Sequence, residues 1–305
     1  MTGARIGGVA GYLSASDLAK SISNDKQPSY IVTGQNYGDV NVSGGSTTSN
    51  PVYIGGVIGL SDIKNMSHNK TSWNESNTNT GNITVNAPVR VVVGGVVGYE
   101  KGLEMTITNT VGGRVISGLK SRGNISVISP ADNSYVGGLI GWHGRGTIAN
   151  ANNIGRYSAE DISNNDKAII SVTGANATVC VGGFIGYLES NNGKGWGCST
   201  VISGFGMWCD ISAINTTAGF IVGRANFKGN SAVAGIMLGT SDNERPKYNT
   251  TSLLNGTEIG ALSQNLDVKR FFGSVQKDGV ETTPIFRKSF SGGDLTHCYT
   301  CLQTY

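Results

Sequence analysis

A single six-residue motif recurs along the chain and constrains the fold more than any other feature. It reads apolar-Gly-Gly-apolar-apolar-Gly, and its successive closing glycines lie 37 to 48 residues apart. Self-similarity at a period of about 20–50 residues is the signature of repeat architectures, so we predict an array of about six stacked units. The motif occupies residues 6–11, 54–59, 93–98, 136–141 and 181–186, with a degenerate copy at 218–223.

A second motif falls between copies of the first. It starts with a turn residue, usually Gly followed by Asn or Asp, and continues as an alternating apolar and polar run that predicts a strand. It is found at residues 38–42, 81–85 and 123–127, and more weakly at 209–213. We therefore expect an all-β fold, and within that class a β-solenoid resembling a parallel β-helix, with like residues stacked about 4.8 Å apart.

A β-propeller is the competing architecture, because its blades also repeat at about 40–45 residues. We rank it second, since the Trp-Asp blade signature is absent and the spacing is uneven. A solenoid tolerates an insertion in one unit better than a closed ring does.

The glycine-bracketed segment is apolar on both faces. In residues 93–99 one face carries Val93, Val97 and Tyr99, and the other carries Val96 between two glycines. This pattern predicts a strand buried on both sides, in which glycine marks a bend or the close approach of another backbone.

The motif ends before the chain does. We assign residues 1–239 to the repeats and 240–305 to a divergent C-terminal segment in which charged residues are more frequent. This segment is either a cap on the open edge of the array, which we favour, or the start of another domain.

Composition excludes several classes of protein. The net charge is only +3 and no cluster of basic residues with interleaved aromatics occurs, so we expect no nucleic-acid partner. No run of about 18 apolar residues is present, so we expect no membrane span. The chain enters the repeat almost at its first residue, and we expect it to be a piece of a longer protein.

The residue that follows each closing glycine is usually aromatic. If the units stack, these residues form a ladder, and the aromatic ones are candidate binding residues for a glycan: Tyr12, Tyr99, Trp142 and Tyr187. The alternative is a purely structural stack, which we favour because two-residue alternation puts Tyr99 on the same face as Val93 and Val97.

Asp and Asn share one position of the second motif, at Asp39, Asn82, Asn124 and Asp210. Such a row could bind calcium, but each unit offers one ligand and amides alternate with carboxylates. We favour a ladder of turn-forming side chains and expect no metal site.

The remaining chemistry-bearing residues do not form an active site. There are five cysteines, of which Cys298 and Cys301 form a Cys-x-x-Cys without the second pair that a zinc site needs. No pair of acidic residues recurs at a spacing suited to glycoside cleavage. We therefore expect no enzyme activity and no cofactor.

Residues 136–150, Val-Gly-Gly-Leu-Ile-Gly-Trp-His-Gly-Arg-Gly-Thr-Ile-Ala-Asn, resemble the GLUG-motif repeat, and the resemblance extends over about residues 6–239. That family occurs in large surface and secreted proteins, mainly bacterial. The peptidases among them carry a His-Glu-x-x-His helix, which this chain lacks.

The resemblance implies a non-catalytic cell-surface or secreted repeat protein, either an adhesin-like segment that binds a host protein or glycan, or a structural spacer. A polysaccharide-binding or polysaccharide-degrading β-helix protein and a trimeric fibre are the alternatives.

Overall fold

The protein is almost entirely β-structure. The only helix in the described residues is the four-residue α1 (Val268–Phe271), which confirms the prediction of an all-β fold. The computed structural model describes residues 3–14, 34–45, 50–62, 72–73, 77–101, 115–116, 118–144, 147–148, 152–155, 167–191, 200–202, 205–228, 234–238, 247–249, 251–260, 268–282, 285–288 and 300–304.

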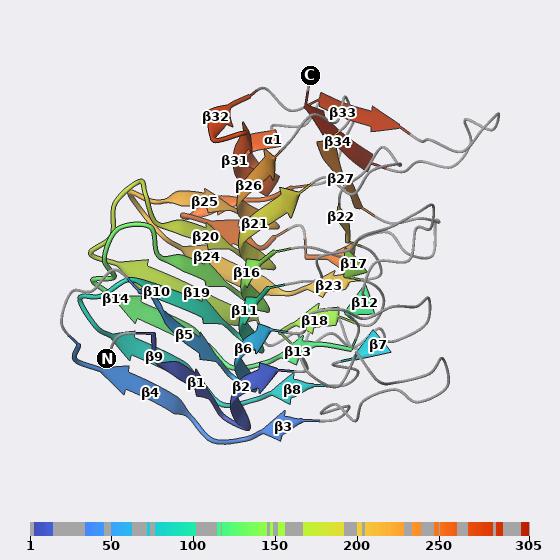
Figure 1. The fold of residues 1–305 in the computed structure, drawn as a ribbon. Helices are drawn as coiled ribbons and strands as arrows, with labels where there is room; N and C mark the ends of the chain where they lie inside the picture. Colours follow the sequence, from blue (N-terminus) through green and yellow to red (C-terminus); the bar gives the residue numbers. More distant parts are fainter. Residues whose placement is uncertain are drawn as a thin grey trace.

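The strands form five sheets, here called A to E, and the chain visits them in the order A, B, E, C, D before it returns to A. Each sheet receives one strand from each successive copy of the sequence motif, except that the described part of sheet E starts with β7 from the second copy, so strands about 40 residues apart lie side by side (Figure 1). A propeller blade would instead draw the strands of one sheet from one copy, and the observed pairing does not fit that alternative.

The strands of sheets A and B flank the glycine motif. Sheet A contains β1 (Arg5–Gly7), β5 (Val52–Gly55), β10 (Val91–Gly94), β15 (Tyr135–Gly137), β20 (Cys180–Gly182) and β25 (Thr217–Gly219). Sheet B contains β2 (Ala10–Ser14), β6 (Ile58–Asp62), β11 (Val97–Glu100), β16 (Ile140–His143), β21 (Ile185–Asn191), β26 (Val222–Lys228), β31 (Phe272–Lys277) and β32 (Val280–Glu281).

The other three sheets complete each turn of the chain. Sheet E contains β7 (Ser72–Trp73), β12 (Val115–Ile116), β17 (Thr147–Ile148), β22 (Thr200–Ile202), β27 (Ala234–Leu238), β34 (Thr300–Thr304) and β33 (Ile285–Lys288). Sheet C contains β3 (Gln35–Asn36), β8 (Thr78–Asn79), β13 (Lys120–Ser121), β18 (Asn152–Ile154), β23 (Phe205–Met207) and β28 (Lys247–Tyr248). Sheet D contains β4 (Val40–Ser43), β9 (Ile83–Asn86), β14 (Ile125–Ile128), β19 (Ala168–Thr173), β24 (Cys209–Ser212), β29 (Leu253–Leu254) and β30 (Thr257–Glu258).

Equivalent motif positions are paired in register. Val93 pairs with Ile54 on one side and with Val136 on the other, and all strand pairs between successive motif copies are parallel. In sheet D, Ile125 pairs with Ile83 and Ile170 in the same way. A slip of one residue would move the apolar side chains to the outer face, so the alternation in the sequence fixes this register.

One main core joins apolar side chains from strands of sheets A, B, C and D. Its members include apolar residues of the glycine motif, such as Val93 and Val97, and apolar residues of the second motif, such as Ile125, all buried. All four residues of β10 are buried, which confirms the prediction of a strand covered on both sides.

Gly94 shows why the motif needs glycine. A β-carbon on Gly94 would overlap the carbonyl oxygen of Val97 and lie 2.7 Å from the amide nitrogen of Gly141 in the next unit. The neighbouring atoms belong to the backbone and cannot rotate away, so no other residue fits this bend.

Parallel pairing continues past residue 240. Strands β28 and β29, which follow the degenerate motif copy at 218–223, pair in parallel with β23 and β24, and β31 pairs in parallel with β26 without a glycine motif copy of its own. Antiparallel strands then follow at this end, with β30 beside β29, β32 beside β31 and β34 beside β27. Whether the C-terminal segment acts as a cap or begins another domain stays a prediction.

Candidate functional site

The aromatic residues predicted to form a ladder lie in register on sheet B. Trp142 pairs with Tyr99 on one side and with Tyr187 on the other. Tyr12 lies at the end of the same row but is separated from Tyr99 by Leu60. The structure therefore brings Tyr99, Trp142 and Tyr187 together, and one intervening unit, which carries Leu60, separates Tyr12 from them.

A second row of side chains on sheet A completes this cluster, and sequence reasoning missed it. Tyr53, Val92, Tyr135 and Cys180 occupy paired positions directly before the first apolar residue of the motif. Val92, Tyr135, Cys180 and Tyr187 form a buried cluster separate from the main core, and Tyr53, Tyr99 and Trp142 pack against it. The sequence does contain a sign of this row, because a tyrosine directly precedes the motif at both position 53 and position 135.

Sequence analysis placed Tyr99 on the same face as Val93 and Val97. The structure puts the two valines in the main core and Tyr99 in the smaller cluster. Val97 and Tyr99 lie two residues apart on the same strand, β11, but the paired positions of this strand skip Gly98, so the two-residue alternation does not hold across this glycine.

The rings stack on one another. Tyr99 and Trp142 are 4.3 Å apart between ring centroids with an interplanar angle of 23°, and Tyr53 lies 5.3 Å from Tyr99 in a similar arrangement. Tyr135 stacks on Tyr187 at 4.5 Å and meets Trp142 edge-on. A sugar-binding platform needs a free aromatic face, and here a neighbouring ring stacks on one face of each of Tyr53, Tyr99, Tyr135, Trp142 and Tyr187.

Tyr12 is the most exposed of the candidate rings, at 43%. Its face is covered as well, because the guanidinium carbon of Arg5 lies 4.0 Å from the ring centroid, a cation–π geometry. Tyr187, at the other end of the row, is only 8% exposed, and its hydroxyl accepts a hydrogen bond from Nδ2 of Asn226.

Burial keeps the titratable groups of the cluster neutral. Loss of solvation raises the pKa of Tyr135 to about 12, and burial also raises the pKa values of Tyr53 and Tyr187. The same cause raises the pKa of the Cys180 thiol to about 12. A phenol or thiol with such a pKa does not supply a nucleophile or a general base at neutral pH.

The Asp and Asn side chains that share one position of the second motif form a ladder of hydrogen bonds to backbone N–H groups. Oδ1 of Asp39 accepts from the backbone N–H of Asn82 at 2.7 Å, and Oδ1 of Asn82 accepts from that of Asn124 at 3.0 Å. Oδ1 of Asn124 accepts from Ile169 at 2.8 Å. Each side chain thus binds the next unit.

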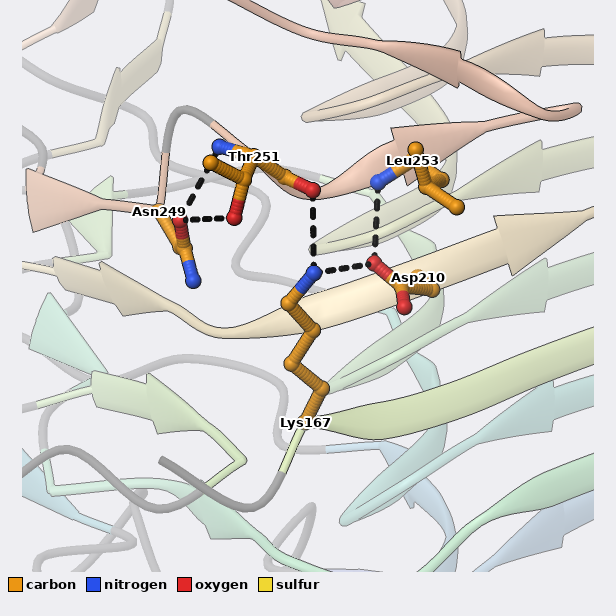
Figure 2. Close-up of polar contacts among 5 residues, drawn as sticks. All are labelled: Lys167, Asp210, Asn249, Thr251 and Leu253. Atoms are coloured by element: carbon orange, nitrogen blue, oxygen red, sulfur yellow. Dashed lines mark hydrogen bonds and ion pairs between the residues drawn. The ribbon is translucent and has the colours of Figure 1, made fainter. Parts of the chain in front are cut away.

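Asp210 occupies the same position near the C-terminal end (Figure 2). Its Oδ1 accepts the backbone N–H of Leu253 at 2.8 Å and also binds the ammonium of Lys167 at 3.1 Å. Nζ of Lys167 donates further to the carbonyl oxygen of Thr251 at 2.9 Å.

The described residues contain no group of three or more His, Cys, Asp or Glu side chains that could hold a metal ion. Cys180 and Cys209 are free and buried, while Cys198 and Cys298 lie outside the described residues, so the Cys-x-x-Cys cannot be placed. No helix in the described part is long and apolar enough to cross a bilayer.

Comparisons with protein-family models, with curated proteins and with solved structures find no match to this chain. The resemblance to GLUG-motif repeats therefore rests on the residues themselves.

Proposed function

We propose that the chain is a β-solenoid segment that serves as a rigid, non-catalytic spacer in a cell-surface or secreted protein. The observation that carries this proposal is the parallel, in-register pairing of equivalent motif positions in all the units that bear them. In such an array each unit contacts only its neighbours, so length grows with the number of units. At about 4.8 Å per unit, six units extend about 30 Å along the axis.

The side chains that connect the units support a structural role. The aromatic rings stack on one another or lie under the guanidinium of Arg5, and the side-chain oxygens of Asp39 and Asn82 accept backbone N–H groups of the next unit. The groups that could have bound a sugar or a cation thus hold the array together, and no described feature favours the carbohydrate-binding alternative.

The extracellular location and the GLUG-type relationship are part of the proposal. They are supported by the motif in residues 136–141 and by a surface that is polar through Asn, Ser and Thr rather than through charge, since charged residues make up only 14% of the chain. We also propose that the antiparallel strands near residues 257–304 cap the array, because a bare parallel edge invites the addition of foreign strands.

Binding panels test the spacer role directly. The purified 305-residue chain is immobilised and exposed to neutral and acidic glycans and to matrix proteins at concentrations up to about 100 µM. The spacer proposal expects no saturable binding. Saturable binding that is abolished by Trp142→Ala, with the fold retained, would establish an adhesin or lectin role and overturn it. Protease treatment of intact source cells tests the location.

A further inference from the structure

The last two strands of sheet D, β29 and β30, form a short hairpin that is attached differently from the other strands of that sheet. Asn255 and Gly256 make its turn, both with positive φ, 51° and 81°, as is typical of an Asn-Gly hairpin. Successive strands from β4 to β24 pair at four positions each, whereas β24 and β29 pair at one, Ile211 with Leu254. The strand ladder therefore contributes little to holding this hairpin.

Residues 251–260, which we call the strap, also bury few apolar side chains. Ile259 is 3% exposed and belongs to the main core, and Leu254 is partly buried against that core. The other buried residue of the strap is the polar Ser252. Segments with few buried apolar contacts open at a lower free energy than the whole protein unfolds, so the strap is suited to local opening.

Side-chain contacts take the place of the missing ladder bonds. Oδ1 of Asp210, on β24, accepts the backbone N–H of Leu253 at 2.8 Å. Oδ1 of Asn255 accepts the backbone N–H of Ala213 at 2.6 Å, and the backbone N–H of Asn255 donates to the carbonyl oxygen of Ile211 at 2.8 Å. The attachment of the strap to β24 thus depends on two side chains, those of Asp210 and Asn255.

Lys167 adds a contact that passes over one strand. It lies directly before β19, and its ammonium binds Asp210 of β24 at 3.1 Å and donates to the carbonyl oxygen of Thr251, 84 residues later, at 2.9 Å (Figure 2). Units of a repeat array contact their nearest neighbours, so this bond ties the strap to a unit beyond its neighbour. The side chains of Lys167 and Asp210 are 25% and 30% exposed, so dissolved salt screens the pair.

We propose that the strap opens locally while the rest of the array stays folded, and that Lys167 is the latch that keeps it closed. Opening separates Leu253 and Asn255 from β24 and exposes the edge of that strand to the addition of another strand, which the closed strap prevents. Because the latch includes an ion pair, opening increases with ionic strength. This behaviour belongs to one end of the array and does not depend on the spacer role.

Hydrogen–deuterium exchange of the 305-residue chain, followed by mass spectrometry of peptides, tests the proposal. We expect the strap to exchange faster than β14, which serves as the internal reference. Lys167→Met is expected to speed exchange of the strap about tenfold, because a hydrogen bond from a charged donor is lost together with the ion pair, and to leave β14 unchanged. At about 1 M sodium chloride, where the Debye length is about 3 Å, exchange of the strap should rise in the wild type and rise less in the variant.

The matched control is Arg122→Met. Arg122 is exposed and lies three residues before Ile125, which pairs with the residue three after Lys167, so it holds the corresponding position one unit earlier. It is expected to leave exchange of the strap unchanged. Asp210→Asn keeps the acceptor for Leu253 but loses the ion pair, so it provides a second variant that should reduce the salt response.

A wild-type strap that exchanges as slowly as β14 would overturn the proposal, because no local opening would then occur. Equal acceleration of the strap and β14 in Lys167→Met would also overturn it, since Lys167 would then stabilise the whole array. The same holds for an unchanged strap in Lys167→Met or for a salt response equal to that of the wild type in both variants. None of these results bears on the binding panels, so the spacer proposal stands or fails separately.

Discussion

The side-chain amide of Asn36 donates a hydrogen bond from Nδ2 to Oδ1 of Asn79, 2.8 Å away and 43 residues later in the chain. Each of these asparagines also donates from Nδ2 to a carbonyl oxygen two residues ahead, that of Gly38 or Gly81. The pair thus closes a turn in each unit and joins the two units, as the Asp39 to Asn82 bond does on the neighbouring strand.

Removal of this amide is expected to destabilise the fold. Asn79→Ala leaves the Nδ2 group of Asn36 and the carbonyl oxygen of Gly81 without their partner in a buried site, at a cost of about 1–3 kcal/mol in the free energy of unfolding. Urea denaturation measures it. Asn86→Ala, at an exposed position on β9, should stay within about 0.5 kcal/mol of wild type; equal losses in both variants would contradict the assignment.

Gly94 is expected to reject even a methyl group. Because the added β-carbon would overlap the carbonyl of Val97, Gly94→Ala should cost about 3 kcal/mol or more, or prevent soluble expression. Gly38→Ala is the matched control, since its nearest neighbour would be 3.8 Å away. Circular dichroism during thermal unfolding separates the two. A wild-type melting temperature for Gly94→Ala would show that the bend does not require glycine.

The aromatic cluster is expected to contribute to stability. Trp142→Ala removes ring contacts with Tyr99, Tyr135 and Tyr187 and should lower the free energy of unfolding by about 3 kcal/mol. Tyr37→Ala, in which the lost ring is 72% exposed, should have little effect. Fluorescence-detected urea unfolding compares them, and a stable Trp142→Ala protein would argue that the cluster serves a ligand instead.

Asp210 allows its two contacts to be separated. Asp210→Asn keeps an oxygen acceptor for the N–H of Leu253 and loses only the partly exposed ion pair with Lys167, which predicts a loss below about 1 kcal/mol. Asp210→Ala loses both and should cost about 1–2 kcal/mol. If the Asn variant loses as much stability as the Ala variant, the ion pair rather than the backbone hydrogen bond accounts for the contribution of Asp210.

Stability is expected to fall at high pH. The pKa of Tyr135 is about 12 in the folded protein against 10.0 for an ordinary tyrosine, so the unfolded chain releases its proton first. The contribution of this group is complete below pH 10 and is lost as the pH rises from about 10 to 12, by roughly 2 kcal/mol. Urea midpoints measured across this range test it. Tyr135→Phe should show a shallower decline, and an identical decline would mean that other groups cause it.

Much of the architecture could be predicted from the sequence. The recurrence of the glycine motif and of the alternating second motif implied all-β structure and the pairing of like residues, because equivalent positions must share a face once strands from successive copies lie side by side. The row of Asp and Asn residues at one position of the second motif was also apparent in the sequence. Its side-chain oxygens accept backbone N–H groups, which fits the turn-forming role expected of Asn and Asp.

Tertiary structure alone decided the rest. A strand that is apolar on both faces does not reveal which face meets the main core, so the sequence could not predict the separate cluster of Tyr53, Tyr99, Tyr135 and Trp142. Strands β28, β29 and β31 carry no motif and join the sheets because the open edge of the preceding unit offers them hydrogen bonds. The local sequence pattern specifies which strands can pair. The side of the sheet to which an aromatic side chain points, and the place where the array ends, depend on contacts between residues about 40 positions apart.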